Sequence, residues 1–561
     1  MSVLLLAYAV RAREGKVLQQ MVSHLNRRNF IAGAIAAAPL TGSLHALAPD
    51  DAPTAQAAGN TRLQAASDLR QRAALAQSRR PLASMKSNGE EDSLPSRIAC
   101  YAKGLPQNQY GEVDPKAYDA LLMAMRSGKF ADFERIPRAG GRKLSNPQSA
   151  FTFHLEGGDS HTFDIPPAPS IAAPEATQET AELYWQALCR DVPFSDYATS
   201  PIIQRAAKHL GATPSSVFRG PTPGDLAGPY ISQFLLKPIP YGAGRIDQKY
   251  SVPVSGDDFM TTVSEWSQIQ LGFPPWLSAN YDPVPRYIRT GRDLAEFVHY
   301  DFAYQAYLGA ALILVNANAK SALNCNQFKS SNNPYRYSTV EEGFVTFGPA
   351  EATDWMGRVT TAALKAAYCQ KWMVHRKVRP EALGGLIHQT RTKVREYPLH
   401  ESLLHSEAVD AVFQKTGSYL LPQTYPEGCP LHPSYPAGHA AIAGACSVIL
   451  KACFDGAMLL PACVEPSKDG QSLVPCTDYA PTIDDEINKL AFNVSMGRDW
   501  AGIHYRSDCT AGLNLGENVA ISILQDLART FTEEFRGFTF LRLNGMKVHI
   551  SPDGQINETR V

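Results

Sequence analysis

Apolar residues recur at the spacing of one helix face along most of the chain, which predicts a mainly helical protein. The clearest stretches in the second half are residues 354–378, 440–454, 484–497 and 509–530. Pro380 disfavours helical conformation at Arg379, so we expect the first of these helices to end there. Residues 440–454 are nearly all apolar and often small, which favours a buried helix.

The first half is predicted to alternate helices with loops rich in proline and glycine. The expected helices are residues 60–78, 116–126, 176–189, 224–236 and 292–316. Strand signals are sparse: we expect one short hairpin at 149–163 and another around Asn544 and Gly545, where apolar and polar residues alternate. The pattern predicts an all-α fold of packed helix bundles with a small C-terminal β-hairpin.

The composition is that of a large globular protein, with 561 residues, 44% hydrophobic and 19% charged. This length is sufficient for two domain-sized halves with a substantial buried core. A formal net charge of -1 provides no basic field for nucleic acid, and the lack of a run of 18 apolar residues predicts no membrane span. Basic residues that cluster in one segment are therefore expected to serve a specific site.

The N-terminal sequence has the order of an export signal. Arg27 and Arg28 precede a small apolar run, and Ala46-Leu47-Ala48 offers a cleavage site. The paired arginines favour the twin-arginine route and a periplasmic or extracellular location. Two alternatives stay open, a start at Met21 rather than Met1 and an amphipathic leader with no export role. We divide the chain into a signal segment (1–48), an N-terminal helical region (49–340), a helical bundle carrying the candidate site (341–530) and a hairpin tail (531–561).

The ten cysteines include no Cys-x-x-Cys pair and are too dispersed for a zinc ribbon. Export would permit disulfides. Cys453, Cys463 and Cys476 share one loop-rich stretch and are the first candidates to pair, although the sequence leaves the connectivity open.

Three separate segments contain residues that suit a tetrahedral oxyanion. The first supplies Lys371, a compact charge, and Arg379, whose guanidinium can donate two parallel hydrogen bonds. On one continuous helix, residues eight apart lie about 80° apart around the axis, so both are expected to face one cavity. The alternative is a solvated basic helix face, because Arg376 and Lys377 lie in the same segment.

The second segment, Pro436-Ala437-Gly438-His439, is a tight turn that leads into a helix. N–H groups at a helix start attract anions, and Gly438 would let an anion approach the backbone closely. His439 is placed to exchange a proton with a bound oxygen. The alternative is a simple turn with a capping histidine.

The third segment adds Arg498, His504 and Asp508. A carboxylate one helical turn after a histidine can accept from one imidazole nitrogen, which leaves the other free as a ligand or nucleophile. A buried histidine satisfied by a neighbouring aspartate is the alternative. Taken together, the three segments favour one site for phosphate or vanadate, because their chemistry is complementary.

This joint pattern resembles the signature shared by vanadium-dependent haloperoxidases and type-2 phosphatidic-acid phosphatases: Lys…Arg-Pro, then Pro-Ser-Gly-His, then Arg…His…Asp. It is most similar to the red-algal and cyanobacterial bromoperoxidases, because seven residues separate Lys371 from Arg379 and His432 precedes His439 by seven. The stretches 104–114 and 379–385 also look red-algal. The resemblance covers the chain from about residue 60 to its end and implies two packed helix bundles of the haloperoxidase and acid phosphatase type.

The resemblance implies a role for each residue. The implied vanadate-binding residues are Lys371, Arg379, Gly438, His439, Arg498 and His504. His504 would be the nitrogen ligand of the metal, and Asp508 would orient it. Lys371 would polarise bound peroxide, His439 would act as acid and base, and His432 would tune the halide pocket.

Two positions depart from the family pattern. The serine before Gly-His is Ala437 here, and an arginine of the red-algal enzymes is replaced by Tyr368. One lost hydrogen bond costs about 0.5–1.5 kcal/mol, less than the about 1.5–3 kcal/mol of each charge-assisted bond. We therefore expect a functional site with weaker vanadate retention. Tyr368 would make the halide pocket less cationic, or it simply packs in the core.

The implied reaction is the oxidation of bromide by hydrogen peroxide, with pentavalent vanadium as a Lewis acid. The resulting hypobromous acid would halogenate small electron-rich organic molecules. Iodide and chloride are further candidate halides: Tyr368 permits chloride, whereas His432 favours bromide. Related algal enzymes form dodecamers and some hold structural calcium, so we expect a homo-oligomer and leave the dodecamer and the calcium ion open.

Two other functions compete with this interpretation. A phosphomonoesterase on the same scaffold would use His504 as the nucleophile and His439 as the acid that protonates the leaving group. A non-catalytic oligomeric shell protein would retain the site without turnover.

Overall fold

The structure is a computed structural model that describes residues 55–316 and 329–560. The predicted signal segment (1–48), both candidate start residues and Cys325 lie outside the described residues. The chain divides into two compact units, Met1–Ala65 and Ala66–Val561, and the second contains every residue of the predicted site.

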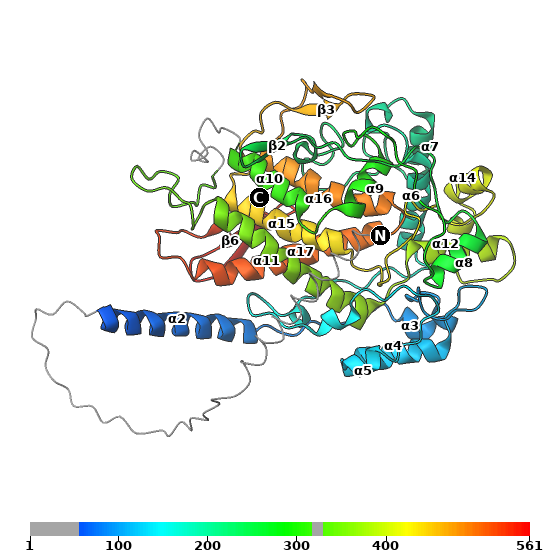
Figure 1. Ribbon diagram of the computed structural model, residues 1–561, viewed down its shortest axis with the longest axis horizontal. Coiled ribbons are helices and arrows are strands. Elements are labelled where there is room, and N and C mark those ends of the chain that lie inside the picture. Colours follow the sequence, from blue (N-terminus) through cyan, green and yellow to red (C-terminus); the bar gives the residue numbers. More distant parts are fainter. Residues whose placement is uncertain (1–54, 317–328, 561) are drawn as a thin grey trace, which may run out of the picture. The chain divides into compact units, whose positions relative to one another are not determined.

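Four long helices form the centre of the second unit (Figure 1). They are α11 (Pro349–Cys369), α15 (Gly438–Cys453), α16 (Ile483–Trp500) and α17 (Arg506–Ala528). α15 contacts the other three, and all its residues except His439 and Cys453 are buried. The prediction of a buried helix at 440–454 is therefore confirmed, and the predicted helices at 484–497 and 509–530 are confirmed with longer bounds.

Glycines allow α15 and α17 to pack closely together. A Cβ atom at Gly516 would lie 1.9 Å from the carbonyl oxygen of Ala441, and one at Gly444 would lie 2.1 Å from that of Leu513. Side chains cannot fit at such distances, so the two backbones are in direct contact. This contact holds together two helices whose N-terminal ends carry predicted site residues.

The described residues form further helices and turns. The longer ones are α2 (Ala55–Ser78), α4 (Pro115–Ser127), α6 (Pro174–Cys189), α7 (Pro201–His209), α8 (Val263–Gln270), α9 (Gly291–Tyr300), α10 (Gln305–Asn316), α12 (Pro380–Arg391) and α14 (Glu407–Thr416). The short ones are α3 (Glu90–Ser93), α5 (Phe130–Phe133), α13 (Glu401–Leu404) and the 3₁₀ turns η1 (Pro95–Arg97), η2 (Pro147–Phe151), η3 (Ser160–Thr162), η4 (Phe194–Asp196) and η5 (Gln233–Leu235). The predicted helices at 60–78, 116–126 and 176–189 are confirmed.

Capping side chains explain where several helices begin. Thr482 and Asp485 form a reciprocal capping box at the start of α16. Thr290 accepts from the N–H of Asp293 at the start of α9. These threonine caps fix the entry of two helices that reach the candidate site.

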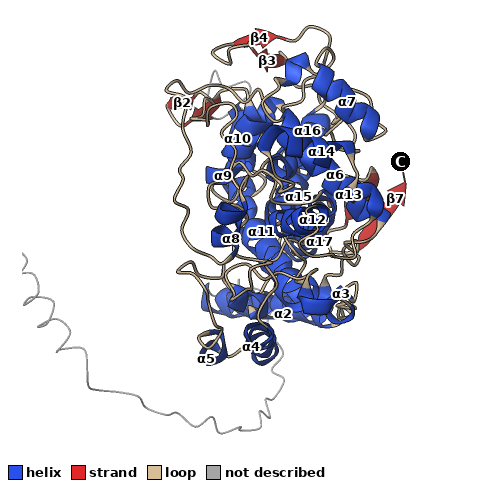
Figure 2. Ribbon diagram, turned by 90° about the vertical axis from the view of Figure 1, so that its right-hand side faces the viewer, coloured by secondary structure: helices blue, strands red, loops and turns tan. Residues whose placement is uncertain are grey.

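The strands form three small antiparallel sheets at the periphery of the helices (Figure 2). Their strands are β1 (Ile239–Tyr241), β2 (Gly244–Ile246), β3 (Val464–Pro466), β4 (Leu473–Pro475), β5 (Phe538–Leu541), β6 (Met546–Ile550) and β7 (Ile556–Arg560). β5 and β6 form the predicted C-terminal hairpin, in register from Phe538 with Ile550 to Leu541 with Lys547, and Gly545 takes the positive φ that the turn needs. That prediction is confirmed, and β7 adds a third strand that was not expected.

The hairpin predicted at 149–163 is wrong. The segment forms the turns η2 and η3, and its backbone donors bind α17 instead of a partner strand. The N–H of Gly157 donates to Asp526 at 2.9 Å, and that of Gly158 donates to Ser522 at 3.0 Å.

The helix predicted at 224–236 is also wrong. The N–H groups of Ser232 and Gln233 donate to Asn493 and Glu486 of α16, which fixes the segment as a loop ending in η5. The helix predicted at 292–316 is divided into α9 and α10, because Asp301 adopts an extended conformation at the end of α9.

The nine described cysteines are free thiols. Cys463 and Cys476 lie beside each other at the end of the β3–β4 pair, where the N–H of Cys476 donates to the carbonyl of Cys463 at 2.9 Å. Their pairing stays a prediction.

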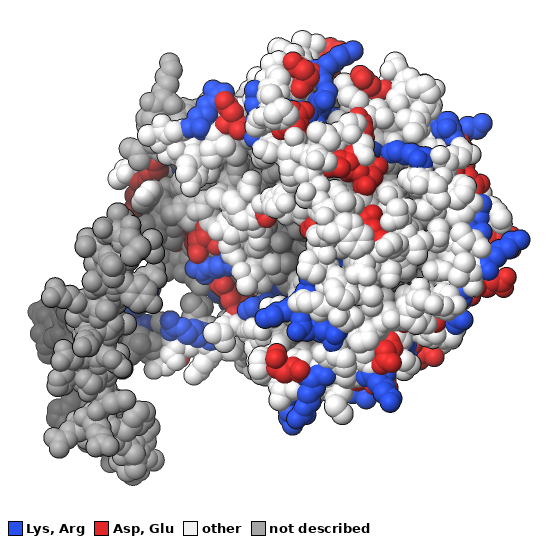
Figure 3. Space-filling model, turned by 45° about the vertical axis from the view of Figure 1, so that its right-hand side comes forward, with Lys and Arg blue, Asp and Glu red and all other residues white. Residues whose placement is uncertain are grey.

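The described part of the chain contains no helix that is both long and apolar enough to span a bilayer. On the face shown in Figure 3, acidic and basic side chains are interspersed, as the net charge of -1 would suggest.

Candidate active site

The segment that carries Lys371 and Arg379 is not one continuous helix, so that prediction is wrong. After Cys369 the chain continues as a π-helical turn, η6 (Gln370–His375), in which the N–H of Arg376 donates to the carbonyl of Lys371 at 3.0 Å. Arg376 then takes a left-handed conformation with φ of 38°. Arg379 is the residue that precedes α12, so the angular estimate made for a regular helix does not apply.

Lys371 and Arg379 nevertheless reach the same loop. Lys371 is fully buried, and its Nζ donates to the carbonyls of Pro433 at 2.8 Å and Ser434 at 2.7 Å. Arg379 Nε donates to the carbonyl of His432 at 2.8 Å. Burial and then the charge of Arg379 hold the pKa of Lys371 well below its ordinary value.

Arg379 connects this loop with the third segment. Its Nη1 donates to the carbonyl of Ile503 at 2.8 Å and lies 3.0 Å from His504 Nε2. Its Nη2 lies 2.8 Å from His432 Nδ1. A guanidinium has only donors, so His504 Nε2 acts as an acceptor here. His432 Nδ1 also lies 3.1 Å from the carbonyl of Pro433.

His504 is therefore a neutral imidazole with its proton on Nδ1. That nitrogen lies 2.8 Å from Asp508 Oδ2, to which it donates. Burial, followed by the charges of Arg379 and Lys371, keeps the pKa of His504 well below its ordinary value. In this neutral tautomer, Nε2 carries the lone pair with which an imidazole can bind a metal.

Arg498 and His439 lie around the same imidazole. The charges of both, like those of Lys371 and Arg379, lower the pKa of His504. Arg498 Nη1 donates to the carbonyl of Val298 at 2.6 Å, and its Nε has no partner among the described residues. His439 is half-buried, and its Nε2 lies 3.0 Å from Asp301 Oδ1.

The other predicted residues lie at the edge of this cluster. The N–H of Ala437 donates to the carbonyl of Asp508 at 2.9 Å, so the starts of α15 and α17 meet, and Gly438 is the first residue of α15. The ring centre of Tyr368 lies 5.4 Å from that of His432. Burial and then Arg379 hold the pKa of His432 well below its ordinary value.

The three central cations have no carboxylate partner within 4.0 Å among the described residues, although Lys371, Arg379 and Arg498 are only 0%, 1% and 7% exposed. Several other buried cations do have one: Arg292 pairs with Asp258 at 2.8 Å, and Lys489 with Glu486 at 3.0 Å. Within the described parts of the chain, Lys329 and Lys451 are buried without one as well, but each is a single cation, whereas the three site cations lie around one imidazole. Buried charges normally need compensation. The cluster is thus prepared for an anion that the protein itself does not supply.

Comparisons with known proteins find relatives over most of the chain. Residues 359–533 match the family model described as the VCPO second helical-bundle domain. The vanadium-dependent bromoperoxidase of Corallina pilulifera is 33% identical over 87% of this chain and 98% of its own length, and that of Ascophyllum nodosum is 33% identical over 83% and 88%.

This chain belongs to the vanadium-dependent bromoperoxidase family. Its fold is similar to that of the second vanadate-dependent bromoperoxidase of Ascophyllum nodosum, a homohexamer, with a TM-score of 0.84 and 27% identity over 96% of both chains. The all-α fold with its small C-terminal sheet, predicted from the sequence, is confirmed.

The donor set fits the vanadate that the family name implies. Arg498 Nε is a buried donor without a partner in the described part of the chain. His504 Nε2 carries a lone pair, which here accepts from Arg379 Nη1, and Lys371 is a further cation near this imidazole. The methyl of Ala437 supplies no hydrogen bond, even to cap α15. Among the described residues no group of three or more histidine, cysteine, aspartate or glutamate side chains could hold a metal ion, and the calcium ion stays a prediction.

Several residues of this bromoperoxidase site were missed in the sequence. Asp301 ends α9 about 140 positions before its partner His439, and no local motif marks it. Ser434 lies inside the His-Pro-Ser-Tyr-Pro stretch, and its hydroxyl donates to Asp508 Oδ2. The sequence did carry a signal for Ser434, because it lies in the same stretch as the predicted site residue His432.

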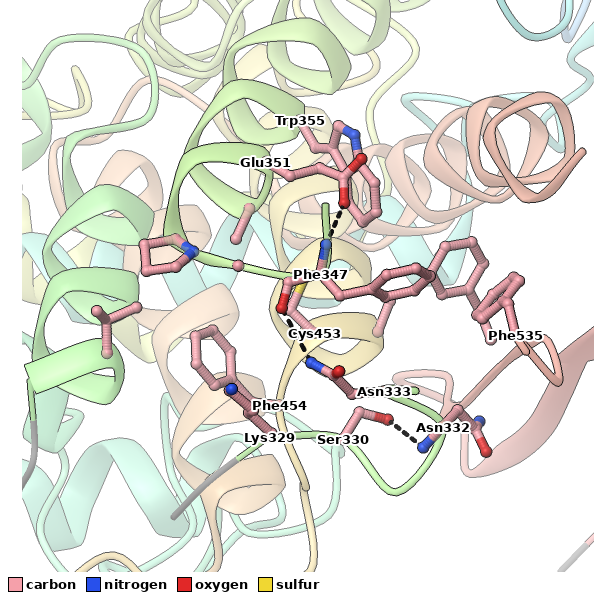
Figure 4. Close-up of a pocket in the computed structure, with 16 residues that line it drawn as sticks. Lys329, Ser330, Asn332, Asn333, Phe347, Glu351, Trp355, Cys453, Phe454 and Phe535 are labelled. Atoms are coloured by element: carbon pink, nitrogen blue, oxygen red, sulfur yellow. Dashed lines mark hydrogen bonds between the residues drawn. The ribbon is translucent and has the colours of Figure 1, made fainter. Parts of the chain in front are cut away.

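A separate pocket lies at the start of α11, away from the bromoperoxidase site (Figure 4). Its walls are mainly apolar, with Phe347, Trp355, Phe454 and Phe535 among them. None of the predicted site residues lines it. The candidate site is therefore distinct from this apolar pocket and is distinguished by its buried positive charge.

Proposed function

We propose that this protein binds vanadate and catalyses the oxidation of bromide by hydrogen peroxide to hypobromous acid, which halogenates small electron-rich organic molecules. The single observation that carries the proposal is a buried group of three cations around a neutral imidazole, with no carboxylate partner among the described residues. Membership of the vanadium-dependent bromoperoxidase family supports it. When bound, vanadate supplies a Lewis acid that activates hydrogen peroxide.

We assign the holding of vanadate to four side chains and one backbone group. His504 offers Nε2, with Asp508 fixing its proton on Nδ1. Lys371, Arg379 and Arg498 compensate the anionic charge. The N–H of Gly438, in the first turn of α15, is an additional donor. The prior orientation of these donors in a water-poor site is the main contribution of the protein.

Proton transfer is assigned to His439. Its Nε2 lies 3.0 Å from Asp301 Oδ1, so the carboxylate orients the ring and leaves Nδ1 to exchange a proton. Lys371, held by two carbonyls, has a third N–H that can donate to a peroxide oxygen. His432 and Tyr368, whose ring centres lie 5.4 Å apart, are assigned to the halide pocket, where His432 favours bromide and Tyr368 leaves chloride and iodide as further candidates.

The experiment is a paired assay of the purified protein after incubation with vanadate. Bromination of a phenolic dye with peroxide and bromide is measured beside hydrolysis of nitrophenyl phosphate. Bromination with retained vanadium is expected, and Lys371→Ala should lose most of both. Lys116→Ala removes an exposed charge and should change neither. Phosphate hydrolysis without bromination would favour the phosphomonoesterase, and no vanadium after reconstitution would favour the shell protein.

We also infer that the protein is exported and forms a homo-oligomer. The sequence around Arg27 and Arg28 supports export, and the homohexamer of a similar structure supports assembly. Fractionation of cells and the mass of the particle in solution test these two proposals, with a hexamer and a dodecamer of the 61.2 kDa chain as distinguishable results.

A further inference from the structure

An ion pair between Lys377 and Asp508 lies directly behind His504. Lys377 Nζ is 3.6 Å from Asp508 Oδ1, which has no hydrogen-bond partner among the described residues. The other carboxylate oxygen, Oδ2, accepts from His504 Nδ1, from the hydroxyl of Ser434 and from the N–H of Tyr505. Lys377 therefore supplies the positive charge that faces the free oxygen.

The position of Lys377 is fixed from α6 and α17. Its Nζ donates to Glu179 Oε1 and to the hydroxyl of Ser507, both at 3.2 Å, and lies 4.1 Å from the ring centre of Tyr505. Glu179 also accepts from the N–H of Ser507 at 2.9 Å. Lys377 is buried, so its ammonium group has little freedom to adopt another position.

The carboxylate of Asp508 has competing attractions. Its charge acts on both Lys371 and Arg379, which lie on the vanadate side of the site. A carboxylate held only from that side would turn toward these cations and away from His504 Nδ1. Lys377 faces Oδ1, the oxygen not bonded to the imidazole, and so favours the orientation in which Oδ2 accepts from His504.

We propose that Lys377 is a positioning residue for the vanadate ligand: through Asp508 it keeps the proton of His504 on Nδ1 and the lone pair of Nε2 directed at the metal. This inference rests on the proposed function. A second role of the same segment follows, because the carbonyl of Lys377 accepts from the N–H of Ser434 at 3.1 Å and so holds the loop that binds Lys371. Only the side-chain role is removed by substitution.

The test compares Lys377→Met, which keeps the length of the side chain but not its charge, with Lys377→Arg. Equilibrium dialysis gives the affinities of each metal-free protein for vanadate and for phosphate. We expect Lys377→Met to bind vanadate at least tenfold more weakly, equivalent to about 1.4 kcal/mol. The loss for phosphate should be less than a third of that factor, because phosphate takes no nitrogen ligand. Lys377→Arg should stay within threefold of the wild type.

Two controls separate positioning from general damage. Lys489→Met breaks a buried lysine–glutamate pair away from the site and should leave vanadate affinity within threefold, even if it lowers the melting temperature. In an Asp508→Asn background, Lys377→Met should cost less than threefold, because the two residues act as one unit.

Equal losses for vanadate and phosphate, or full additivity in the Asp508→Asn background, would overturn the positioning role. Unchanged vanadate affinity in Lys377→Met would do the same. A wild-type protein that binds phosphate but never vanadate would instead remove the proposed function.

Discussion

At the scale of single residues, the guanidinium of Arg379 influences the protonation of the neighbouring imidazoles, because it can only donate hydrogen bonds. Arg379 offers donors to the carbonyls of His432 and Ile503 and to two imidazoles. Together with burial, this arrangement favours the neutral forms of His432 and His504, and Asp508 accepts the proton-bearing Nδ1 of His504. An incoming anion therefore meets rings whose protons are already placed.

Ala437→Ser is predicted to tighten vanadate binding. A serine hydroxyl at this position can donate one hydrogen bond, worth about 0.5–1.5 kcal/mol or roughly two- to tenfold in affinity. Equilibrium dialysis measures the affinity, and thermal unfolding of the metal-free protein serves as the control. Ala437 precedes α15 and makes no side-chain cap, so the new hydroxyl could cap the helix instead. A higher melting temperature with unchanged affinity would show that outcome and refute the prediction.

Asp301→Asn is predicted to lower bromination turnover about tenfold, within the range of acid–base contributions. Asparagine keeps a hydrogen bond to His439 but removes the carboxylate charge that faces the ring proposed to transfer the proton. Steady-state rates on vanadate-loaded enzyme check this, with vanadium content measured in the same samples. Undiminished turnover would exclude Asp301 from proton transfer, whereas parallel loss of vanadium would reassign it to binding.

The residues of the three segments could be predicted because their chemistry is local: an imidazole just before α17 and a carboxylate four positions later in its first turn, or a glycine at a helix start. Asp301 and Val298 could not, since they reach the site only through the packing of α9 on α16. The angular argument for Lys371 and Arg379 failed because a π turn interrupts the helix between them.

At the scale of elements, the contact of α15 with α17 sets the distance between the Gly438 end and the Asp508 end of the site. Both helix starts converge through the bond from Ala437 to Asp508. Small residues in 440–454 predicted this packing from the sequence. The loops at 149–163 and 224–236 could not be predicted, because side chains of distant helices bind their backbone donors.

Gly516→Ala is predicted to destabilise the protein by about 1–3 kcal/mol, because the added methyl would lie 1.9 Å from the carbonyl of Ala441. Gly357→Ala is the matched control: it is also helical, and its nearest neighbour, the Tyr304 hydroxyl, is 4.0 Å away. That variant should be neutral or stabilised by up to about 1 kcal/mol. Thermal or denaturant unfolding measures both. Equal stability of the two variants would mean that the helices can separate at no cost.

Glu351, in the first turn of α11, is predicted to make stability depend on pH. Burial, reinforced by Glu533 and Asp354, raises the pKa of its carboxyl to about 7, despite the N–H of Phe347. The folded state holds this proton more tightly than the unfolded chain, so the contribution is present below about pH 4.5 and is lost as pH rises toward 7. Glu351→Gln should therefore raise the melting temperature more at pH 8 than at pH 5.

Glu342→Gln removes the same charge from an exposed position and is the control for net charge. A Glu351→Gln variant whose melting temperature changes equally at both pH values would contradict the assignment.

At the scale of the whole molecule, the site is assembled from parts of the chain that lie far apart. α6 contributes Glu179 and Glu182 to the start of α17, with Glu182 pairing with Arg506 at 2.5 Å, and α9 contributes Asp301. The first half is therefore part of the site's support. The division of the chain at residue 340 remains a prediction made from the sequence.

Vanadate is predicted to stabilise the whole protein against unfolding. A ligand that binds only the folded state at 100 times its Kd adds about 2.7 kcal/mol. Thermal unfolding with increasing vanadate should show a rising melting temperature for the wild type. Arg498→Met, which removes a cation from the site, should show a smaller rise. An equal rise in both proteins would mean that vanadate acts elsewhere.

The absence of carboxylate partners for Lys371, Arg379 and Arg498 among the described residues has a practical consequence. The three positive side chains repel one another, and a bound tetrahedral oxyanion reduces this repulsion. Which oxyanion binds therefore depends on the concentrations of the competing anions as much as on the affinity of the site for each. Phosphate buffer should hold the enzyme in an inactive, phosphate-filled state, so loading with vanadate calls for phosphate-free solution.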